Sequence, residues 1–113
     1  TAKGDENMGI FSLFAGTNIN EGIKQYESAE DAVLLDVRTA GEYRGGHIPG
    51  SINLSVDNID RVGKVIPDKS KEIFVYCLSG ARSGQAVNFL KRSGYEKVTN
   101  IGGLNRYKGK LEI

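Results

Sequence analysis

Short runs of apolar residues alternate along the chain with polar turns. Two of these runs, 33–35 and 73–76, contain no charged or amide residue, which is the pattern of parallel strands covered on both faces. The short segments 51–54 and 98–101, which mix apolar and polar residues, predict two further strands. A strand is therefore expected about every twenty residues from position 33 onward.

Between the strands, apolar positions recur at helical spacing and follow residues that cap helices. The expected caps are Asn20, with Ile19 as the apolar residue before it, Thr39, paired with Glu42 in a capping-box pattern, and Asp57. The expected inward-facing residues are Ile23 and Tyr26, Ile59 and Val62, Ala86, Val87 and Leu90, and, after a turn at Gly102-Gly103, Leu104 and Tyr107. This alternation of strands and short helices predicts an α/β domain with a mostly parallel sheet and helices on both faces.

The first residues carry a weaker pattern. Residues 1–7 are small and polar and precede the only methionine, Met8, so we interpret them as a cloning remnant or a disordered tail. Residues 10–14 have apolar positions at helix-like spacing, but the stretch is too short to separate a helical turn from a strand. Residues 8–113 are expected to form a single domain.

The overall charge narrows the range of functions. A net charge of +1, with scattered lysines and arginines, argues against binding to nucleic acid or to an anionic membrane. One cysteine and one histidine cannot supply a closed four-ligand zinc site, and no apolar run reaches the roughly 20 residues of a membrane span. We expect a soluble, cytoplasmic protein without metal or cofactor, with a monomer as the default state.

The single cysteine, Cys77, stands between a strand end and a helix start. Amides at a helix start have no partners within the helix and stabilise an anion, which includes a thiolate. Arg82 supplies a nearby cation, and Gly80 can adopt a positive φ that turns successive amides toward the sulfur. We therefore expect a low pKa for the Cys77 thiol instead of an inert core cysteine.

Several motifs together resemble the single-domain rhodanese (thiosulfate sulfurtransferase) family. They are Leu35-Asp36-Val37-Arg38, Glu42-Tyr43, the segment from Gly46 to Asn53, Val75-Tyr76-Cys77 through Arg82-Ser83, and Gly102-Gly103. They occur in the order typical of that family and cover most of the chain from about position 19 onward. Where many members carry tryptophan after the paired glycines, this chain has Tyr107.

The resemblance implies a five-stranded, mostly parallel sheet and a catalytic cysteine in a cradle of amides. It assigns the sulfur-carrying role to Cys77 and a supporting, mainly structural role to Asp36 and Arg38. The substrate-binding residues that it implies are Leu78, Ser79, Gly80, Ala81 and Arg82, with Ser83 beside them.

The implied reaction is a double displacement through a persulfide on Cys77. The sulfur comes from a small-molecule donor such as thiosulfate and passes to cyanide, a thiol or a protein acceptor. Because the chain has one cysteine, no internal thiol can resolve the persulfide, and the acceptor must be an outside molecule.

Several roles stay open on the sequence alone. Arg82 either binds the anionic donor or orients the loop, and Ser83 either caps the helix or, like Ser79, donates a hydrogen bond to the sulfur. A Cys77–His47 dyad would instead indicate acyl transfer, but His47 lies in a turn motif that resembles the structural signature of the family. Asp36 and Glu42 are interpreted as structural groups and not as general bases, because an ionised thiol needs no base.

Two other functions compete with sulfur transfer. Cysteine phosphatases and arsenate reductases also hold an anion in a loop from cysteine to arginine, but the phosphatases have five intervening residues where this chain has four. A non-catalytic rhodanese-like binding module is the other alternative, although such modules usually lack the cysteine. The length of the loop and the presence of Cys77 favour sulfur transfer.

Overall fold

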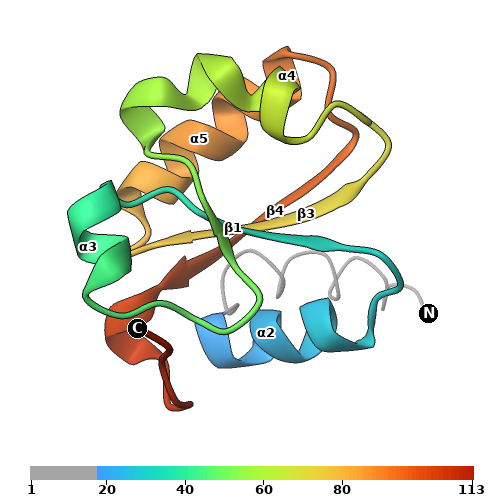
Figure 1. Cartoon of the computed structure of the whole chain (residues 1–113). Helices are drawn as coiled ribbons and strands as arrows, with labels where there is room; N and C mark the ends of the chain where they lie inside the picture. The colour runs from blue at the N-terminus through green and yellow to red at the C-terminus, as the bar shows by residue number, and fades with distance from the viewer. Residues whose placement is uncertain (1–17) are drawn as a thin grey trace.

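The computed structural model describes residues 18–113, and a four-stranded parallel sheet lies at its centre (Figure 1). Its strands are β1 (Val33–Asp36), β2 (Ile52–Asn53), β3 (Glu72–Cys77) and β4 (Lys97–Gly103). The strand order is β2-β1-β3-β4, and every neighbouring pair is parallel. The α/β prediction is confirmed, but this part of the chain has four strands where the resemblance implied five.

Helices cover both faces of the sheet, as the alternating pattern predicts (Figure 1). Helix α2 (Ile19–Ser28) lies on one face, and α4 (Val62–Val65) and α5 (Ala81–Arg92) lie on the other. The short helix α3 (Ala40–Arg44) stands near the carboxyl ends of the strands, at the left in Figure 1. Two 3₁₀ helices complete the fold, η1 (Val56–Arg61) and η2 (Leu104–Arg106).

Each face of the sheet has its own buried core. Leu35, Val75 and Leu90 belong to the cluster beneath α5, and Ile23 and Phe74 belong to the cluster beneath α2. Apolar side chains on both sides of β1 and β3 explain why these strands read as unbroken apolar runs.

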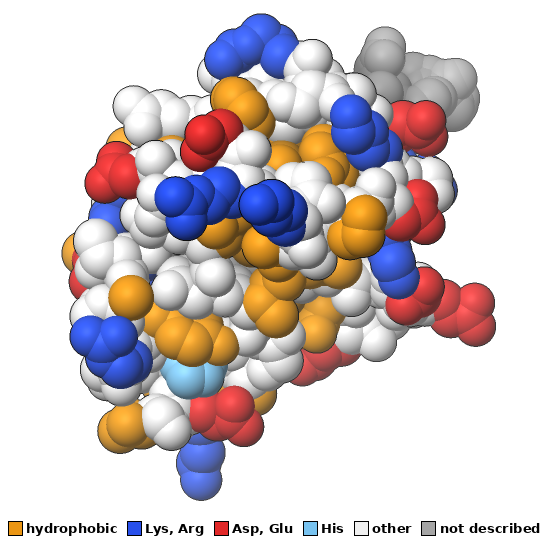
Figure 2. All heavy atoms as spheres, turned by 45° about the horizontal axis from the view of Figure 1, so that its top comes forward, with side chains coloured by type: hydrophobic (Ala, Val, Ile, Leu, Met, Phe, Trp, Pro, Cys, Tyr) orange, Lys and Arg blue, Asp and Glu red, His pale blue; other side chains and the backbone are white. Residues whose placement is uncertain are grey.

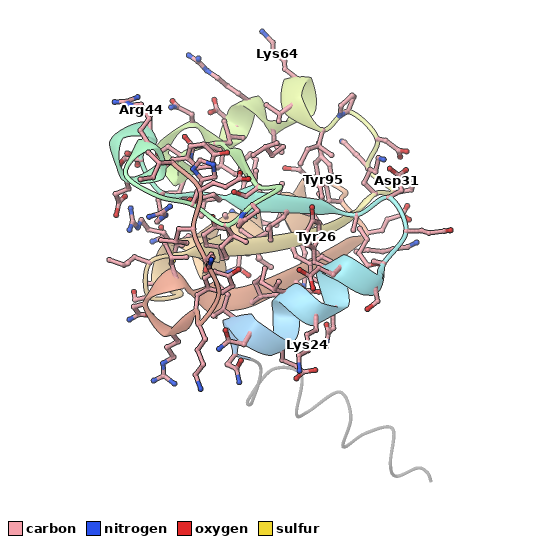
Figure 3. The ribbon with its side chains drawn as sticks, turned by 60° about the horizontal axis from the view of Figure 1, so that its bottom comes forward. Lys24, Tyr26, Asp31, Arg44, Lys64 and Tyr95 are labelled. Atoms are coloured by element: carbon pink, nitrogen blue, oxygen red, sulfur yellow. The ribbon has the colours of Figure 1, made fainter. Side chains whose placement is uncertain are left out.

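Helix α2 is amphipathic, with one side against the sheet and the other in solvent. In Figure 3, Tyr26 points from α2 toward the sheet, where its ring meets Phe74 edge to face at 6.2 Å between centroids. Lys24 points away from the sheet. The predicted inward role of Tyr26 is therefore confirmed.

Two of the three predicted helix caps are wrong. Helix α2 begins two residues earlier than expected, because Asn18 is its cap and accepts a hydrogen bond from the Glu21 amide at 3.1 Å. Asn20 instead binds the C-terminal segment: its amide donates to the Arg106 carbonyl at 3.0 Å, and its oxygen accepts from the Lys108 amide at 2.9 Å.

The cap of η1 is also an earlier residue than expected. Ser55 is its cap and accepts from the amide of Asp57, the residue expected to cap. The Thr39 cap is confirmed, because its hydroxyl accepts from the Glu42 amide while the Glu42 carboxylate accepts from the Thr39 amide.

The paired glycines form the end of a strand, not the predicted turn. Val75 pairs with Asn100 and Tyr76 with Gly102, so Ile101 is the extra residue of a β-bulge. A Cβ atom at Gly103 would overlap the Leu78 carbonyl oxygen and lie 2.7 Å from the Ser79 Cα. Glycine is therefore required because the loop after β3 rests directly on β4.

The expectations for residues 1–7 and 10–14 lie outside the described residues. Within 18–113, no helix has the length and apolar character needed to cross a membrane. The same part of the chain contains no cluster of three or more metal-binding side chains.

Candidate active site

The segment between β3 and α5 is shorter than the predicted six-residue loop. Cys77 is the last residue of β3, and Gly80, with φ of 105°, is the cap residue from which α5 begins at Ala81. Gly80 provides the left-handed turn expected of it. Arg82 and Ser83 therefore lie in the first turn of α5.

The Cys77 sulfur is held from this turn. The Gly80 amide donates a hydrogen bond to Sγ at 3.0 Å, and the Ser83 hydroxyl lies 3.4 Å from the same atom. The cysteine side chain is also fully buried, and it packs in the core beneath α5 beside residues such as Val37. It thus has an apolar contact on one side and hydrogen-bond donors on the other.

Two opposing effects act on the pKa of the Cys77 thiol. Burial raises the pKa, because the charged thiolate loses contact with water. Hydrogen bonds from the Ser83 side chain and from the amides of Ser83, Gly80 and Ser79 lower it. The donors prevail, and the pKa lies below that of an ordinary cysteine.

Ser83 is not the cap of α5, because that helix has no side-chain cap. Its buried hydroxyl lies 3.0 Å from the Gly80 carbonyl and 2.8 Å from the Asn100 side-chain oxygen, in addition to Cys77. Asn100 also accepts a hydrogen bond from the Gly102 amide at 2.9 Å. No local sequence signal singles out Asn100, because the β-bulge and the β3–β4 pairing bring it to the site.

Arg82 extends from α5 to α3, where it meets Glu42. Arg82 Nη1 lies 2.8 Å from Glu42 Oε1, and Nη2 lies 3.1 Å from Oε2, so the pair is bidentate. This ion pair and the Thr39 amide lower the pKa of Glu42 to about 2, and the carboxylate raises the pKa of Arg82. Glu42 thus does more than cap α3, because it also fixes the guanidinium beside the cysteine turn.

Asp36 and Arg38 form a second ion pair, at the carboxyl end of β1. Both side chains are buried, and Arg38 Nη2 lies 2.7 Å from Asp36 Oδ2 and 2.8 Å from the Gly46 carbonyl. The Arg38 amide also donates to Asp36. These contacts join β1 to the turn after α3.

His47 is engaged away from the cysteine. Its ring stacks on Tyr43 with 3.7 Å between centroids, and Nδ1 lies 2.8 Å from the Tyr43 carbonyl. The His47 backbone forms two hydrogen bonds with Glu112. The imidazole therefore has partners that match a structural role.

The outer side of the cysteine turn is open to solvent. Leu78 and Ser79 are exposed, and the Leu78 carbonyl accepts a hydrogen bond from the Asn105 amide at 3.1 Å. A cavity of about 420 Å³ begins at Ser79 and Gly103 and extends over Asn105 and Arg106. Both sides of the turn are thus defined, one by the buried sulfur and one by this open cavity.

A known domain family matches most of the chain. The model of the rhodanese-like domain matches residues 20–110. The chain belongs to the rhodanese-like domain family. The resemblance seen in its motifs is thereby confirmed.

Relatives of this rhodanese domain include proteins named as sulfurtransferases. The chain is 39% identical over 71 residues to thiosulfate sulfurtransferase PspE of Escherichia coli, a match that covers 62% of this chain and 68% of that protein. It is 34% identical over 94 residues to the putative sulfur carrier protein YrkF of Bacillus subtilis, with 81% of this chain and 50% of that protein covered. It thus spans about half of YrkF. A tRNA uridine(34) hydroxylase of E. coli is 29% identical and is covered over 31% of its length.

Solved structures show the same fold. A rhodanese with anions from E. coli has a TM-score of 0.66 and 34% identity, with 72% of this chain and 96% of that chain covered. The SSP1007 protein of Staphylococcus saprophyticus has a TM-score of 0.74 and 26% identity, with 85% and 96% covered. The α/β architecture of this rhodanese domain is therefore that of its family.

Proposed function

We propose that this rhodanese domain is a sulfurtransferase that moves a sulfane sulfur from a donor such as thiosulfate to a thiophilic acceptor. The observation that carries the proposal is the Cys77 sulfur, held at 3.0 Å by the Gly80 amide and contacted by Ser83, with a lowered thiol pKa. A thiolate fixed by donors is a nucleophile that needs no separate base. The sulfurtransferase names among its relatives support the same chemistry.

The first step forms one sulfur–sulfur bond and breaks another. The Cys77 thiolate attacks the outer sulfur of thiosulfate, an S–S bond forms on the enzyme, and the electron pair of the cleaved bond leaves with sulfite. In the second step cyanide attacks the outer sulfur of the persulfide, forming thiocyanate and returning the thiolate. The amides of Ser79, Gly80 and Ser83 are positioned to stabilise negative charge on sulfur in both steps without reorganising.

Leu78, Ala81 and Arg82 complete the proposed substrate-binding segment. Leu78 would shield the sulfur and Ala81 would add an amide at the start of α5, while the Arg82 pair with Glu42 favours orientation of the turn by Arg82. Asp36 and Arg38 would support the site by holding β1 and the turn after α3.

Steady-state kinetics with thiosulfate and cyanide test the proposal. Parallel lines in double-reciprocal plots and loss of thiocyanate formation in Cys77→Ser are expected, because the sulfur is carried covalently between two half-reactions. Thiocyanate formation by the serine variant at the wild-type rate would contradict the proposal.

The rival functions predict other outcomes. Hydrolysis of an aryl phosphate that depends on Cys77 would indicate a phosphatase, and arsenate reduction that depends on it an arsenate reductase. Partner capture that survives Cys77→Ser, with no sulfur transfer by the wild type, would indicate a binding module. The proposed sulfurtransferase is a cytoplasmic monomer. Its sulfur acceptor is an outside thiol or protein, and it has no nucleic-acid or membrane partner.

A further inference from the structure

The charged side chains beside the cysteine turn come as two ion pairs. Asp36 and Arg38 pair in the interior, and Glu42 and Arg82 pair across α3 and α5 with about one third of each side chain exposed. Each pair has one carboxylate and one guanidinium, so the formal charge of the four groups is zero.

Glu42 is held firmly in this arrangement. Its Oε1 accepts from the Thr39 amide at 2.9 Å as well as from Arg82, so one carboxylate serves both the α3 cap and the ion pair. With a pKa of about 2, it stays charged throughout the neutral range. Arg82 is therefore neutralised by Glu42, a carboxylate that the capping box of α3 also holds in place.

The donors that face the sulfur are mainly dipoles. The amides of Ser79, Gly80 and Ser83 and the Ser83 hydroxyl carry no net charge. They stabilise the charge on one sulfur, but they add no net positive charge to balance the second negative charge of a dianionic donor. An unpaired arginine would supply that charge, and Arg82 is paired.

Resting on the sulfurtransferase function proposed above, we propose that Glu42 sets donor specificity by neutralising Arg82. The rhodanese domain then discriminates against the second charge of a dianion such as thiosulfate, and it favours sulfane donors with a single negative charge. Organic persulfides and thiosulfonates are donors of this class. Glu42 is thus a specificity-determining residue that acts through local charge.

Thiosulfate and methanethiosulfonate form a suitable pair of probes. Both transfer an outer sulfur to the Cys77 thiolate, and the electron pair of the broken S–S bond leaves with sulfite or with methanesulfinate. The first donor carries two negative charges and the second carries one. The ratio of their kcat/KM values therefore measures discrimination by charge.

The variants are Glu42→Gln, Arg82→Gln and the double variant. Glutamine at position 42 can still form the capping box, so α3 keeps its cap while the carboxylate charge is lost. Glu96→Gln is the control of matched net charge, since exposed Glu96 precedes β4 at the opposite end of the strands from Cys77. Circular dichroism and Tm establish that each variant is folded.

The ratio of kcat/KM for thiosulfate to kcat/KM for methanethiosulfonate should follow the local charge. We expect a rise of about three- to tenfold in Glu42→Gln and a fall of similar size in Arg82→Gln at low salt. In the double variant and in the Glu96→Gln control, this ratio should lie within about twofold of the wild-type ratio. An unchanged ratio in Glu42→Gln overturns the proposal, and so does a double variant as low as Arg82→Gln, since that result makes Arg82 a direct donor-binding group.

A second pair of probes separates this proposal from the proposed function. Iodoacetate and iodoacetamide both alkylate Cys77 with loss of iodide, but only iodoacetate is negatively charged. The ratio of their rates should rise in Glu42→Gln and fall in Arg82→Gln even if neither sulfane donor loads the enzyme. Absence of sulfur transfer would then refute the function alone, and an invariant alkylation ratio would refute the role of Glu42.

Discussion

Hydrogen bonds from one short segment of chain lower the pKa of the Cys77 thiol. The Gly80 amide and the Ser83 hydroxyl lie at 3.0 and 3.4 Å from it, and a fully buried side chain would otherwise favour the neutral thiol. Arg82, the cation expected to supply this effect, is paired with Glu42. Donor geometry is therefore the property to test.

Ser83→Ala should raise the pKa of the Cys77 thiol, because it removes the hydroxyl that lies 3.4 Å from Sγ and contributes to the lowered pKa. The rate of alkylation by iodoacetamide as a function of pH measures this shift. Ser79→Ala is the matched control, since Ser79 contributes its backbone amide, which alanine retains. Equal pKa values in wild type and Ser83→Ala would show that the hydroxyl does not stabilise the thiolate.

The same thiol should make stability depend on pH. A folded-state pKa below that of the unfolded chain means that the unfolded chain binds more protons between the two values, so the free energy of unfolding rises with pH there. The contribution is complete above the unfolded pKa of about 8.5, and it is lost as pH falls through the folded value. Urea unfolding of wild type and Cys77→Ser at several pH values should show a gap that widens with pH, whereas a gap that narrows would reverse the sign of the shift.

Asp36→Ala should destabilise the domain by about 3–5 kcal/mol, because it leaves Arg38 buried with a lost partner. Urea unfolding gives the value. Asp57→Ala is a control on an exposed carboxylate, for which we expect a change within about 0.5 kcal/mol. If both variants lost a comparable free energy of unfolding, the buried Asp36–Arg38 pair would have no special role in stability.

The cysteine turn is supported by the end of β4. Gly103 lies beneath Leu78 and Ser79, the Asn105 amide binds the Leu78 carbonyl, and Asn100 contacts Ser83. The β-bulge at Ile101 brings these groups into position. The position of the sulfur is thus set by two strands and one helix together.

Gly103→Ala should lower the rate of sulfur transfer at least about tenfold, because the added methyl group displaces the turn that holds the Cys77 sulfur. Thiocyanate formation measures the effect. Gly63→Ala is the control, since nothing lies within 4 Å of a Cβ at that helical position. A folded Gly103→Ala protein with wild-type turnover would show that the turn tolerates displacement.

The sequence pattern predicted where the helices and strands lie more accurately than it predicted which residues cap the helices. The buried runs in β1 and β3 lie in the sheet because their apolar character is local and continuous. Asn18 and Asn20 are both suitable caps, and contacts with Arg106 and Lys108, more than 80 residues away, take up Asn20. Such distant partners cannot be read from a local pattern.

The features of the candidate site also divide into those that the sequence could reveal and those that it could not. Cys77 and Gly80 could be selected because their chemistry and turn geometry are local. The bonds from Ser83 to Asn100 and from Arg82 to Glu42 depend on strand pairing and helix packing, so the sequence alone did not reveal them. The part missed is therefore the part that the tertiary fold creates.

Charge is spread across the domain. Figure 2 shows acidic and basic side chains interspersed on the face that it presents, in keeping with a net charge of +1. Such a surface exerts little long-range attraction on an anion. Sulfur transfer would then depend on the cysteine turn more than on the surrounding field.

Intact-mass spectrometry after incubation with thiosulfate is the decisive test for a persulfide on Cys77. We expect a gain of one sulfur atom per chain, located on Cys77 by peptide analysis, absent in Cys77→Ser and removed by cyanide as thiocyanate. An unchanged mass in a folded protein whose Cys77 still reacts with iodoacetamide would contradict this expectation.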